Sequence, residues 1–367
     1  MRPLRLLAAV IGSPQLLGAR PAAPPYSLSG AGGTAPAPDR PATRARLRAW
    51  AELLRVSALV TVPGDALAGA AAAGRRPGRG TALAAGASLC LYEAGMALND
   101  WADREEDAVD RPHRPIPSGR VTPGAALAAA AVLTGAGLAL ASRAGRPALA
   151  VASGLAATVW AYDLRLKHTQ LGPAAMATAR TLDLMLGATA TVATMSAQAG
   201  RGGAASPARS ATAPTRSATA PAPSAALPAA LALGAHTYAV TAVSRHEVQG
   251  GSTAAPLAAL AGVAGIGAAV LRGRPAPGEP HRAPAPAVRL LLPAFAAAYL
   301  RTSAVPLLHA ALNPSPPLTQ RAVGGGIRAM IPLQAALTAR AGAPLDGLAV
   351  MGLVPLARAL ARKVSAT

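Results

Sequence analysis

Long runs without any charged residue restrict this chain's fold more than any other feature. Six segments lack Asp, Glu, Lys and Arg entirely: 121–142, 147–162, 184–200, 217–244, 248–271 and 302–320. A helix needs about 20 mostly apolar residues to cross a bilayer, and several of these runs reach that length. A surface helix of a water-soluble protein would instead carry a polar face along its whole length. The chain is therefore predicted to be an all-α protein that crosses a membrane several times.

The distribution of apolar residues predicts a bundle of nine or ten transmembrane helices. The expected spans are 50–72, 80–99, 122–142, 146–163, 172–196, 225–243, 252–272, 287–309, 321–340 and 344–361. Residues 1–45 are rich in Pro, Ala and Gly and are expected to form a disordered extension, with an uncleaved signal peptide or a misassigned start as the alternative. Residues 46–367 would form one transmembrane domain, with a low-complexity loop at 197–224.

Charge and cysteine content narrow the function classes. The net charge of +20 would suit a nucleic-acid-binding protein, but the arginines are scattered through loops and only 2% of the residues are aromatic. Arginines that hold loops on the cytoplasmic side explain the charge more simply. Cys90 is the single cysteine, which excludes an internal disulfide and a cysteine-based metal site.

Arginines before the first span predict the orientation of the chain. Arg44, Arg46 and Arg48 precede that span, so the positive-inside rule places the N-terminus in the cytoplasm. Alternation of the spans then places three loops on the same side: 100–121, 163–171 and 244–251. We therefore expect one composite site on the cytoplasmic face of a bacterial-type plasma membrane.

An acidic segment at the end of the second expected span carries the strongest chemical signal. If the helix continues through it, Asn99, Asp103 and Asp107 share one face, with Asp100 and Asp110 beside them. Stacked carboxylates repel each other, and a bound Mg²⁺ would offset the repulsion while substrate phosphates complete its coordination. The alternative interpretation is a solvated acidic helix end followed by a basic turn.

Cationic residues in the first two loops would bind the same phosphates. The loop after the acidic segment contributes three arginines: Arg111, Arg114 and Arg120. The second loop carries Arg165 and Lys167 close to Tyr162, and a lysine can act there as a point charge on phosphate. An interfacial tyrosine with snorkelling cations is the alternative for this loop.

The third loop contains one carboxylate after two basic residues, in the order Arg245, His246 and Glu247. Glu247 could bind a metal or orient a ligand. Alternatively, it forms a structural ion pair with Arg245 at the helix end, and an exposed pair of this kind contributes little to stability.

The charged residues inside the expected spans include Asp65, Glu93, Arg180 and Asp183. Arg180 and Asp183 are three residues apart, so they can pair within the bundle. Charges in such positions usually face a partner or a cavity. A transporter or a non-catalytic lipid-binding protein would use these residues as a polar pathway, and this is the competing class of function.

These motifs resemble the UbiA superfamily of intramembrane prenyltransferases. The family pattern Asn-Asp-x-x-Asp-x-x-x-Asp followed by Arg-Pro is matched from Asn99 to Pro112, and the likeness continues to Arg120. The pattern Tyr-x-x-x-x-Lys is matched by Tyr162 and Lys167. The resemblance extends over residues 46–361 and implies a helical bundle around a cavity that opens to the cytoplasm and laterally to lipid.

The resemblance also implies a reaction. An isoprenyl diphosphate bound with Mg²⁺ would ionise to an allylic cation, which Tyr162 would shield, and a lipophilic or small-molecule acceptor would take the prenyl group. Asp103, Asp107, Lys167 and Tyr162 would be the catalytic residues. Five residues would hold the metal: Asn99, Asp100, Asp103, Asp107 and Glu247. Five cations would bind the diphosphate: Arg111, Arg114, Arg120, Arg165 and Lys167.

One departure from the family pattern concerns the third loop. Most members carry a second Asp-rich motif there, whereas this chain reads Ser-Arg-His-Glu-Val-Gln-Gly-Gly from residue 244. That variant resembles the EboC-like branch of the family. Glu247 then stands in the position of the second Asp pair, so the sequence leaves open whether one or two metal ions bind.

Overall fold

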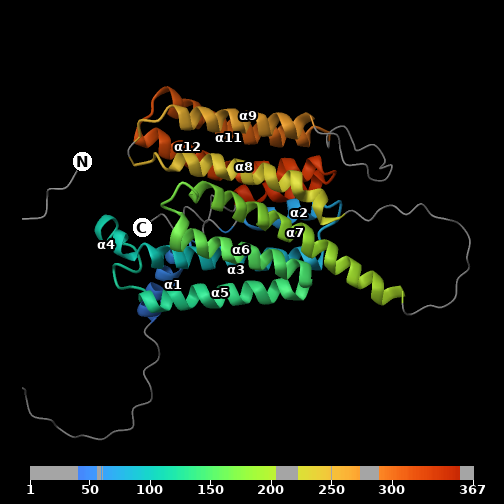
Figure 1. The fold of residues 1–367 in the computed structure, drawn as a ribbon, viewed down its shortest axis with the longest axis horizontal. Coiled ribbons are helices and arrows are strands. Elements are labelled where there is room, and N and C mark those ends of the chain that lie inside the picture. The colour runs from blue at the N-terminus through green and yellow to red at the C-terminus, as the bar shows by residue number, and fades with distance from the viewer. Residues whose placement is uncertain are drawn as a thin grey trace, which may run out of the picture. The chain divides into compact units, whose positions relative to one another are not determined.

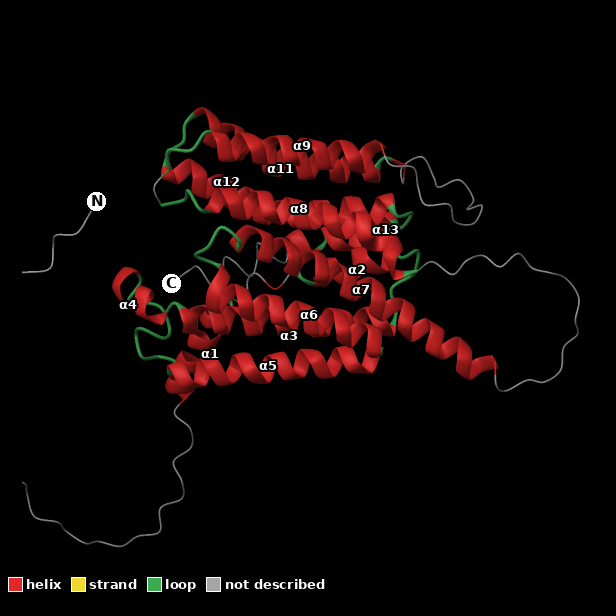
Figure 2. Cartoon of the chain, in the orientation of Figure 1, coloured by secondary structure: helices red, strands yellow, loops and turns green. Residues whose placement is uncertain are grey.

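The computed structural model describes residues 40–55, 59, 61–203, 222–248, 250–272 and 289–355, and no strand occurs among them. The all-α prediction is therefore confirmed. The long helices from α2 onward belong to one compact unit, Arg44–Thr367, and lie side by side as a bundle (Figures 1 and 2).

The helices in chain order are α1 (Arg40–Leu53), α2 (Pro63–Ala72), α3 (Arg79–Ala102), α4 (Arg104–Asp110), α5 (Pro123–Ala144), α6 (Arg146–Ala161), α7 (Gly172–Gly203), α8 (Leu227–Ser244), α9 (Ala254–Arg272), α11 (Leu291–Leu312), α12 (Pro316–Arg340) and α13 (Pro344–Met351). Five of the described segments are long and apolar enough to cross a membrane: α3, α5, α8 with the 3₁₀ turn before it, α9 and α11. The count of nine or ten crossings remains a prediction.

The first expected span, 50–72, is wrong as a continuous helix. α1 ends at Leu53, and Arg55 has a left-handed backbone with φ of 47°, which a helix cannot accommodate. α2 begins at Pro63, whose fixed φ and missing N–H suit a first helical position. The expected 197–224 loop also begins later, because α7 extends to Gly203. Residues 1–39, 204–221 and 356–367 lie outside the described residues.

A sharp connection between α5 and α6 forms one end of the bundle. Thr122 starts α5 by accepting a hydrogen bond from the amide of Ala125 at 3.3 Å, and Pro123 follows at the first helical position. Gly145 ends α5 with φ of 129°, a conformation that favours glycine, and α6 starts at the next residue. The connection therefore places Arg143 and Arg146 together at the end opposite Thr122.

Small residues allow α2 and α7 to pack with their backbones in contact. A Cβ atom on Gly69 would lie 2.2 Å from the carbonyl oxygen of Leu184, and one on Gly187 would lie 2.6 Å from the Cα of Ala66. Such close approach is typical of membrane helices, where packing of small residues drives association. A methyl group at either glycine would force the two helices apart.

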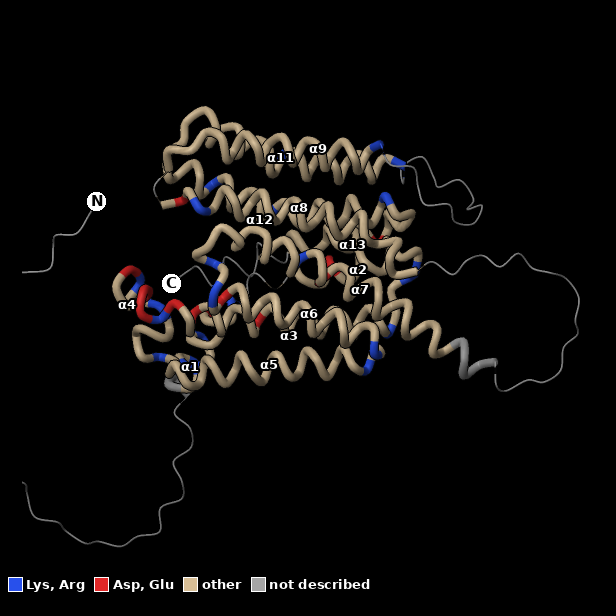
Figure 3. Tube along the Cα trace, viewed as in Figure 1, with Lys and Arg blue, Asp and Glu red and all other residues tan. Residues whose placement is uncertain are grey.

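Basic and acidic residues are distributed differently over the bundle (Figure 3). Acidic residues gather near α4, at the end where α3 and α6 finish, with arginines among them. Arginines also occupy the opposite end, for example Arg143 and Arg146. Arginines therefore occur at both ends of the bundle. The cytoplasmic position of the N-terminus remains a prediction.

Candidate functional site

Three loops that are far apart in the sequence meet at one end of the bundle. Lys167, which follows α6, forms an ion pair with Asp103, which follows α3. Arg245, which follows α8, donates a hydrogen bond to the backbone oxygen of Thr169. These contacts confirm that the three expected loops lie together. The side of the membrane that they face remains a prediction.

Two helices rather than one carry the acidic motif. α3 ends at Ala102, and Asp103 joins it to α4. The helix considered from the sequence as continuing through Asp107 is therefore interrupted at Asp103. The amide of Asp103 nevertheless bonds to the oxygen of Asn99 at 2.9 Å, and the amide of Asp107 bonds to the oxygen of Asp103 at 2.8 Å. The helical spacing of the row thus continues across the joint.

Arginines pair with the two buried carboxylates of the motif, Asp100 and Asp107. Arg114 Nη1 lies 2.6 Å from Oδ2 of Asp107 and 3.4 Å from Oδ1 of Asp100. Arg55 lies 3.3 Å from Asp100, and Arg111 lies 3.4 Å from Asp107. Mg²⁺ was expected to offset the repulsion between these carboxylates, and in the structure guanidinium groups do so as well. Arg55 was not among the predicted site residues.

Two of the predicted diphosphate-binding arginines form no contact with the acidic motif among the described residues. Arg120 pairs with Glu52 of α1 through contacts of 2.7 and 3.2 Å, and also donates to the backbone oxygen of His113 at 2.5 Å. Arg165 is exposed and forms no hydrogen bond or ion pair with any residue that the structure describes. Either side chain would have to move to bind a phosphate beside Asp107.

The Tyr-x-x-x-x-Lys pattern forms one π-helical turn at the end of α6. The turn covers Tyr162–Leu166, and the amide of Lys167 bonds to the oxygen of Tyr162 at 3.0 Å. Residues five apart are bonded in a π-turn, whereas in an α-helix they point in clearly different directions. The π-turn therefore explains the five-residue spacing of the pattern, because its hydrogen bond joins the backbones of Tyr162 and Lys167.

Asp163 is a site residue that the sequence interpretation missed. It is 4% exposed and accepts a hydrogen bond from Nδ2 of Asn99 at 3.1 Å. Burial raises the pKa of Asp163 to about 7, against the lowering effects of the Asn99 hydrogen bond and the Lys167 charge. A carboxylate directly after an apolar run and beside Tyr162 was the signal that could have revealed it.

A cavity of about 350 Å³ lies between the acidic motif and the π-turn. Its lining includes Trp101, Asp103, Glu106, Asp163, Lys167 and His168. The ligand atoms of Asp103, Glu106 and His168 all lie within 4.8 Å of one another, which is close enough to hold one metal ion. Carboxylate oxygens suit Mg²⁺, whereas an imidazole nitrogen suits softer metals. The donors Asp103 and Glu106 therefore fit the expected cation, and Glu106 was not predicted.

Glu247 is half-buried and lies near the acidic motif. Burial raises the pKa of Glu247, while the charge of Arg111 lowers it. Glu247 does not pair with Arg245, because that arginine donates to the backbone of Thr169 instead. The structural ion pair considered from the sequence is thus absent among the described residues. A role for Glu247 as a metal ligand remains a prediction.

A second ionic cluster lies inside the bundle. Arg180 Nη1 is 3.8 Å from Oδ2 of Asp183, as predicted, and 2.5 Å from Oδ2 of Asp65. Gln334 donates to Oδ1 of Asp65 at 2.7 Å, and Ser88 donates to Asp183. Each of these charged groups is paired with a neighbour in the cluster. This arrangement fits a structural connection between helices more simply than an open polar pathway.

Family membership follows once this geometry is compared with known proteins. The fold and the site define an all-helical membrane protein with an acid-rich, arginine-paired site at one end of its bundle. The UbiA prenyltransferase family model matches residues 59–271, more than half of the chain, and the chain belongs to this family. Membership of the EboC-like branch remains a prediction.

Curated relatives match parts of the chain. Digeranylgeranylglyceryl phosphate synthase of Methanopyrus kandleri is 38% identical over 130 residues, covering 34% of this chain and 46% of the relative. The enzyme of the same name from Ignicoccus hospitalis is 35% identical over 147 residues, covering 40% and 48%. The matched segments thus span about half the length of these two relatives.

Solved structures show the same fold. A digeranylgeranylglyceryl phosphate synthase structure aligns with a TM-score of 0.52 at 16% identity, covering 81% of this chain and 98% of its own. A UbiA homologue from Archaeoglobus fulgidus, bound to GPP and Mg²⁺, aligns with a TM-score of 0.52 at 17% identity, covering 83% and 99%. At such low identity the likeness concerns the arrangement of helices.

Proposed function

We propose that this chain is a membrane prenyltransferase that moves an isoprenyl group from an isoprenyl diphosphate to a lipophilic or small-molecule acceptor. One observation carries the proposal. Carboxylates and cations at one end of the bundle face each other as pairs, with Asp103 against Lys167 and Asp107 against Arg114. Such pairs can separate when a magnesium diphosphate binds, because each side chain then gains a partner of opposite charge.

The residues that would hold Mg²⁺ are the oxygen donors of the acidic motif: Asn99, Asp100, Asp103 and Asp107. Glu106 adds a carboxylate on the cavity side, and Glu247 would approach from the third loop. When bound, Mg²⁺ would neutralise charge on the diphosphate and make it a better leaving group. Asp163 would keep Asn99 oriented, since it accepts a hydrogen bond from the amide of that residue.

Cationic side chains would hold the diphosphate as it departs. Lys167 is 10% exposed at the cavity, so its ammonium would bind an anion with little competition from water. Arg114 is 21% exposed between Asp100 and Asp107, and Arg111 lies beside it. Arg120 and Arg165 would join after their side chains turn toward the site. These groups act on negative charge that grows as the carbon–oxygen bond breaks.

The remaining residues concern the prenyl group and its acceptor. Tyr162 is positioned next to Lys167 by the π-turn, and its ring could shield an allylic cation. The relatives support an isoprenyl donor, because one is a digeranylgeranylglyceryl phosphate synthase and one solved homologue holds GPP with Mg²⁺. A site at the end of a membrane bundle also lets the prenyl chain stay in lipid.

Release of diphosphate by the purified full-length protein tests the proposal. Geranyl, farnesyl and geranylgeranyl diphosphate would each be supplied with a membrane extract as the source of acceptor, with Mg²⁺ or with a chelator. We expect release and a labelled lipophilic product only with Mg²⁺. Asp107→Asn should abolish both, whereas Asp110→Asn should not, because Asp110 is exposed and unpaired among the described residues. No turnover with any donor would favour the transport-type alternative.

We further propose that this end of the bundle faces the cytoplasm of a bacterial-type plasma membrane. The arginines before the first span support this orientation. Single cysteines in a Cys90→Ser background provide the test, with Glu105→Cys at the site end and Arg143→Cys at the other end. A membrane-impermeant thiol reagent added to intact cells should label position 143 and not position 105. The reverse pattern would place the site outside.

A further inference from the structure

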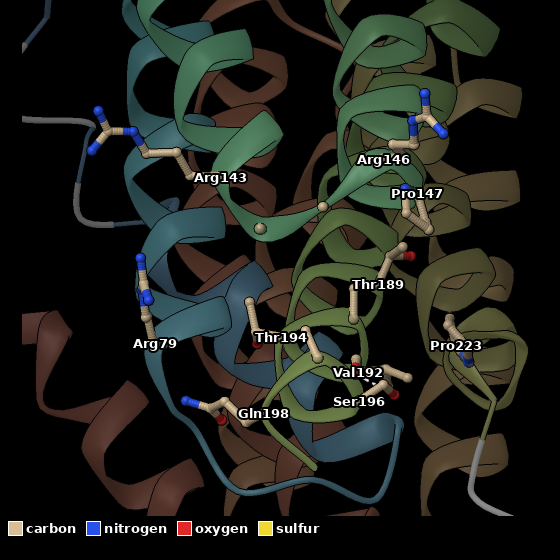
Figure 4. Close-up of a pocket in the computed structure, with 14 residues that line it drawn as sticks. Arg79, Arg143, Arg146, Pro147, Thr189, Val192, Thr194, Ser196, Gln198 and Pro223 are labelled. Atoms are coloured by element: carbon tan, nitrogen blue, oxygen red, sulfur yellow. Dashed lines mark hydrogen bonds between the residues drawn. The ribbon is translucent and has the colours of Figure 1, made fainter. Parts of the chain in front are cut away.

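A second cavity lies at the end of the bundle opposite the acidic motif. Its volume is about 680 Å³, and it is formed where α5 ends, α6 and α3 begin and α7 passes (Figure 4). Arg79, Arg143 and Arg146 line it together with hydroxyl and amide side chains from α7 such as Thr194 and Gln198. Neither the family match nor the proposed reaction assigns it a role.

The three arginines of this cavity lack acidic partners. No Asp or Glu lines the cavity, and none of the three forms an ion pair with a residue that the structure describes. The flanking sequence supplies none either, because residues 111–162 and 184–246 contain no Asp or Glu. An arginine cannot lose its charge at physiological pH. The cavity therefore keeps a standing positive potential that an anion would neutralise.

The level of the cavity relative to the membrane indicates which kind of anion would bind there. α5 has a 22-residue length and high apolar content, and only 22% of its most apolar window is buried inside the bundle. Most of this helix is thus available to lipid, and its end at Ala144 marks the level where hydrocarbon gives way to headgroups. Arg143 and Arg146 flank that point, which is the level at which phospholipid phosphates lie.

The positions of the arginines also fit a headgroup. Figure 4 shows Arg79 and Arg143 on one side of the cavity and Arg146 on the other side of the α5–α6 connection. Pockets that bind small molecules commonly range from about 300 to 1,000 Å³, so this volume accommodates a headgroup with its glycerol. The side chains of Arg143 and Arg146 are exposed and directed away from each other (Figure 4), so they would turn toward a bound headgroup, and Gln198 would add a neutral donor.

We infer that this cavity binds the headgroup of an anionic phospholipid. The lipid would be held by its phosphate at the rim that Arg79, Arg143 and Arg146 form, while its acyl chains follow the exposed face of α5. Basic pockets between transmembrane helices recognise anionic lipids in this way. The inference does not depend on the prenyl transfer proposed above, since the two sites lie at opposite ends of the bundle.

The test compares lipids in nanodiscs that contain the full-length protein. Phosphatidylglycerol in place of phosphatidylcholine should raise the melting temperature of the wild type by about 3 °C, as expected for a ligand that binds only the folded state. Arg143→Gln/Arg146→Gln should lose this increment. The control variant Arg272→Gln/Arg289→Gln removes the same charge outside the cavity, at the end where α9 finishes (Figure 1). This control should keep the increment in melting temperature.

Two results would overturn the inference. Equal loss of the increment in both double variants would mean that diffuse surface charge attracts the lipid. Full stabilisation of the phosphatidylcholine sample by inorganic phosphate would mean that the cavity takes free phosphate instead. Native mass spectrometry provides a measurement independent of stability: phosphatidylglycerol should remain on the wild type and on the control variant, and should be lost from the cavity variant.

Discussion

The two ends of this bundle handle positive charge in opposite ways. At the acidic end, arginines and Lys167 are paired with carboxylates, as in the Arg114–Asp107 contact of 2.6 Å. At the other end, Arg143 and its neighbours have no acidic partner among the described residues. Cations that are paired internally can be released to a ligand that brings both a metal and an anion. Cations that are unpaired attract an anion alone.

The difference teaches how one composition can serve two kinds of site. Both ends rely on arginine, and the number of arginines does not separate them. The carboxylates do, because six of the chain's fifteen acidic residues lie between Asp100 and Asp110, in and beside α4 (Figure 3). Substitutions that remove one member of a pair should therefore have large effects at the acidic end and small effects on turnover at the other end.

The largest effect on turnover is expected for Asp103→Asn. Its carboxylate lines the cavity, pairs with Lys167 and belongs to the cluster that can hold a metal. Loss of a metal ligand should lower the rate of diphosphate release on the order of a thousandfold. Arg143→Gln is the matched control at the other end and should leave the rate unchanged. Comparable rate losses in both variants would erase the distinction between the two ends.

The next largest effect is expected on stability, from the ionic cluster in the interior of the bundle. Arg180→Met would leave Asp65 and Asp183 buried without their cation, and breaking a buried ion pair in this way costs about 3–5 kcal/mol. Thermal unfolding in detergent should show a clear loss. Adding Asp65→Asn and Asp183→Asn to the same variant should recover most of it. Failure of this triple variant to recover would show that Arg180 acts through packing rather than charge.

Lys167→Met should lower turnover by about a hundredfold, because a charge-assisted contact to the departing diphosphate is lost. Lys167→Arg should retain part of the activity, since it keeps the charge while changing its geometry. Initial rates at saturating donor measure the effect. If Lys167→Met matched the wild type, the Lys167–Asp103 pair would be purely structural, and the acidic end would be no more reactive than the other end.

The smallest effect is expected for Glu247→Gln. The amide keeps the shape and deletes the charge, so the Mg²⁺ concentration for half-maximal activity should rise roughly fivefold, about 1 kcal/mol. The melting temperature should stay constant, because Glu247 forms no ion pair with Arg245. Since burial raises the pKa of Glu247, the advantage of the wild type should shrink as the pH falls through that pKa. An unchanged Mg²⁺ requirement would exclude Glu247 as a ligand.

Helix boundaries were largely predictable from the sequence, because uncharged runs of Ala and Leu have few alternatives in a membrane. The expected span 252–272 corresponds to α9 at Ala254–Arg272, and 122–142 corresponds to α5 at Pro123–Ala144. The break after Leu53 was missed because the mostly apolar run 50–72 has the length of one span, although Pro63 within it is typical of the start of a new helix. Hydropathy describes how apolar a segment is and carries no information on where the backbone turns.

The composition of the site was only partly predictable. Asp100, Asp103 and Asp107 were identified from their spacing, and the structure places them at one end of the bundle with Arg111 and Arg114. Partners contributed from a distance were missed. Arg55 comes from the segment after α1, and Asp163 reaches Asn99 across 64 residues. Such contacts depend on which helices become neighbours, and a single sequence gives no spacing rule for that.

Because lysine is scarce in this chain, an amine-directed reagent can modify the acidic end selectively. The chain has only two lysines, Lys167 and Lys363, so amine-directed reagents have few side chains to modify. Lys167 forms an ion pair with Asp103 and is 10% exposed, so a reagent has limited access to its nitrogen. If Asp103 turned to a metal, the amine would lose that partner. The acylation rate of one side chain would then report metal occupancy without any measurement of turnover.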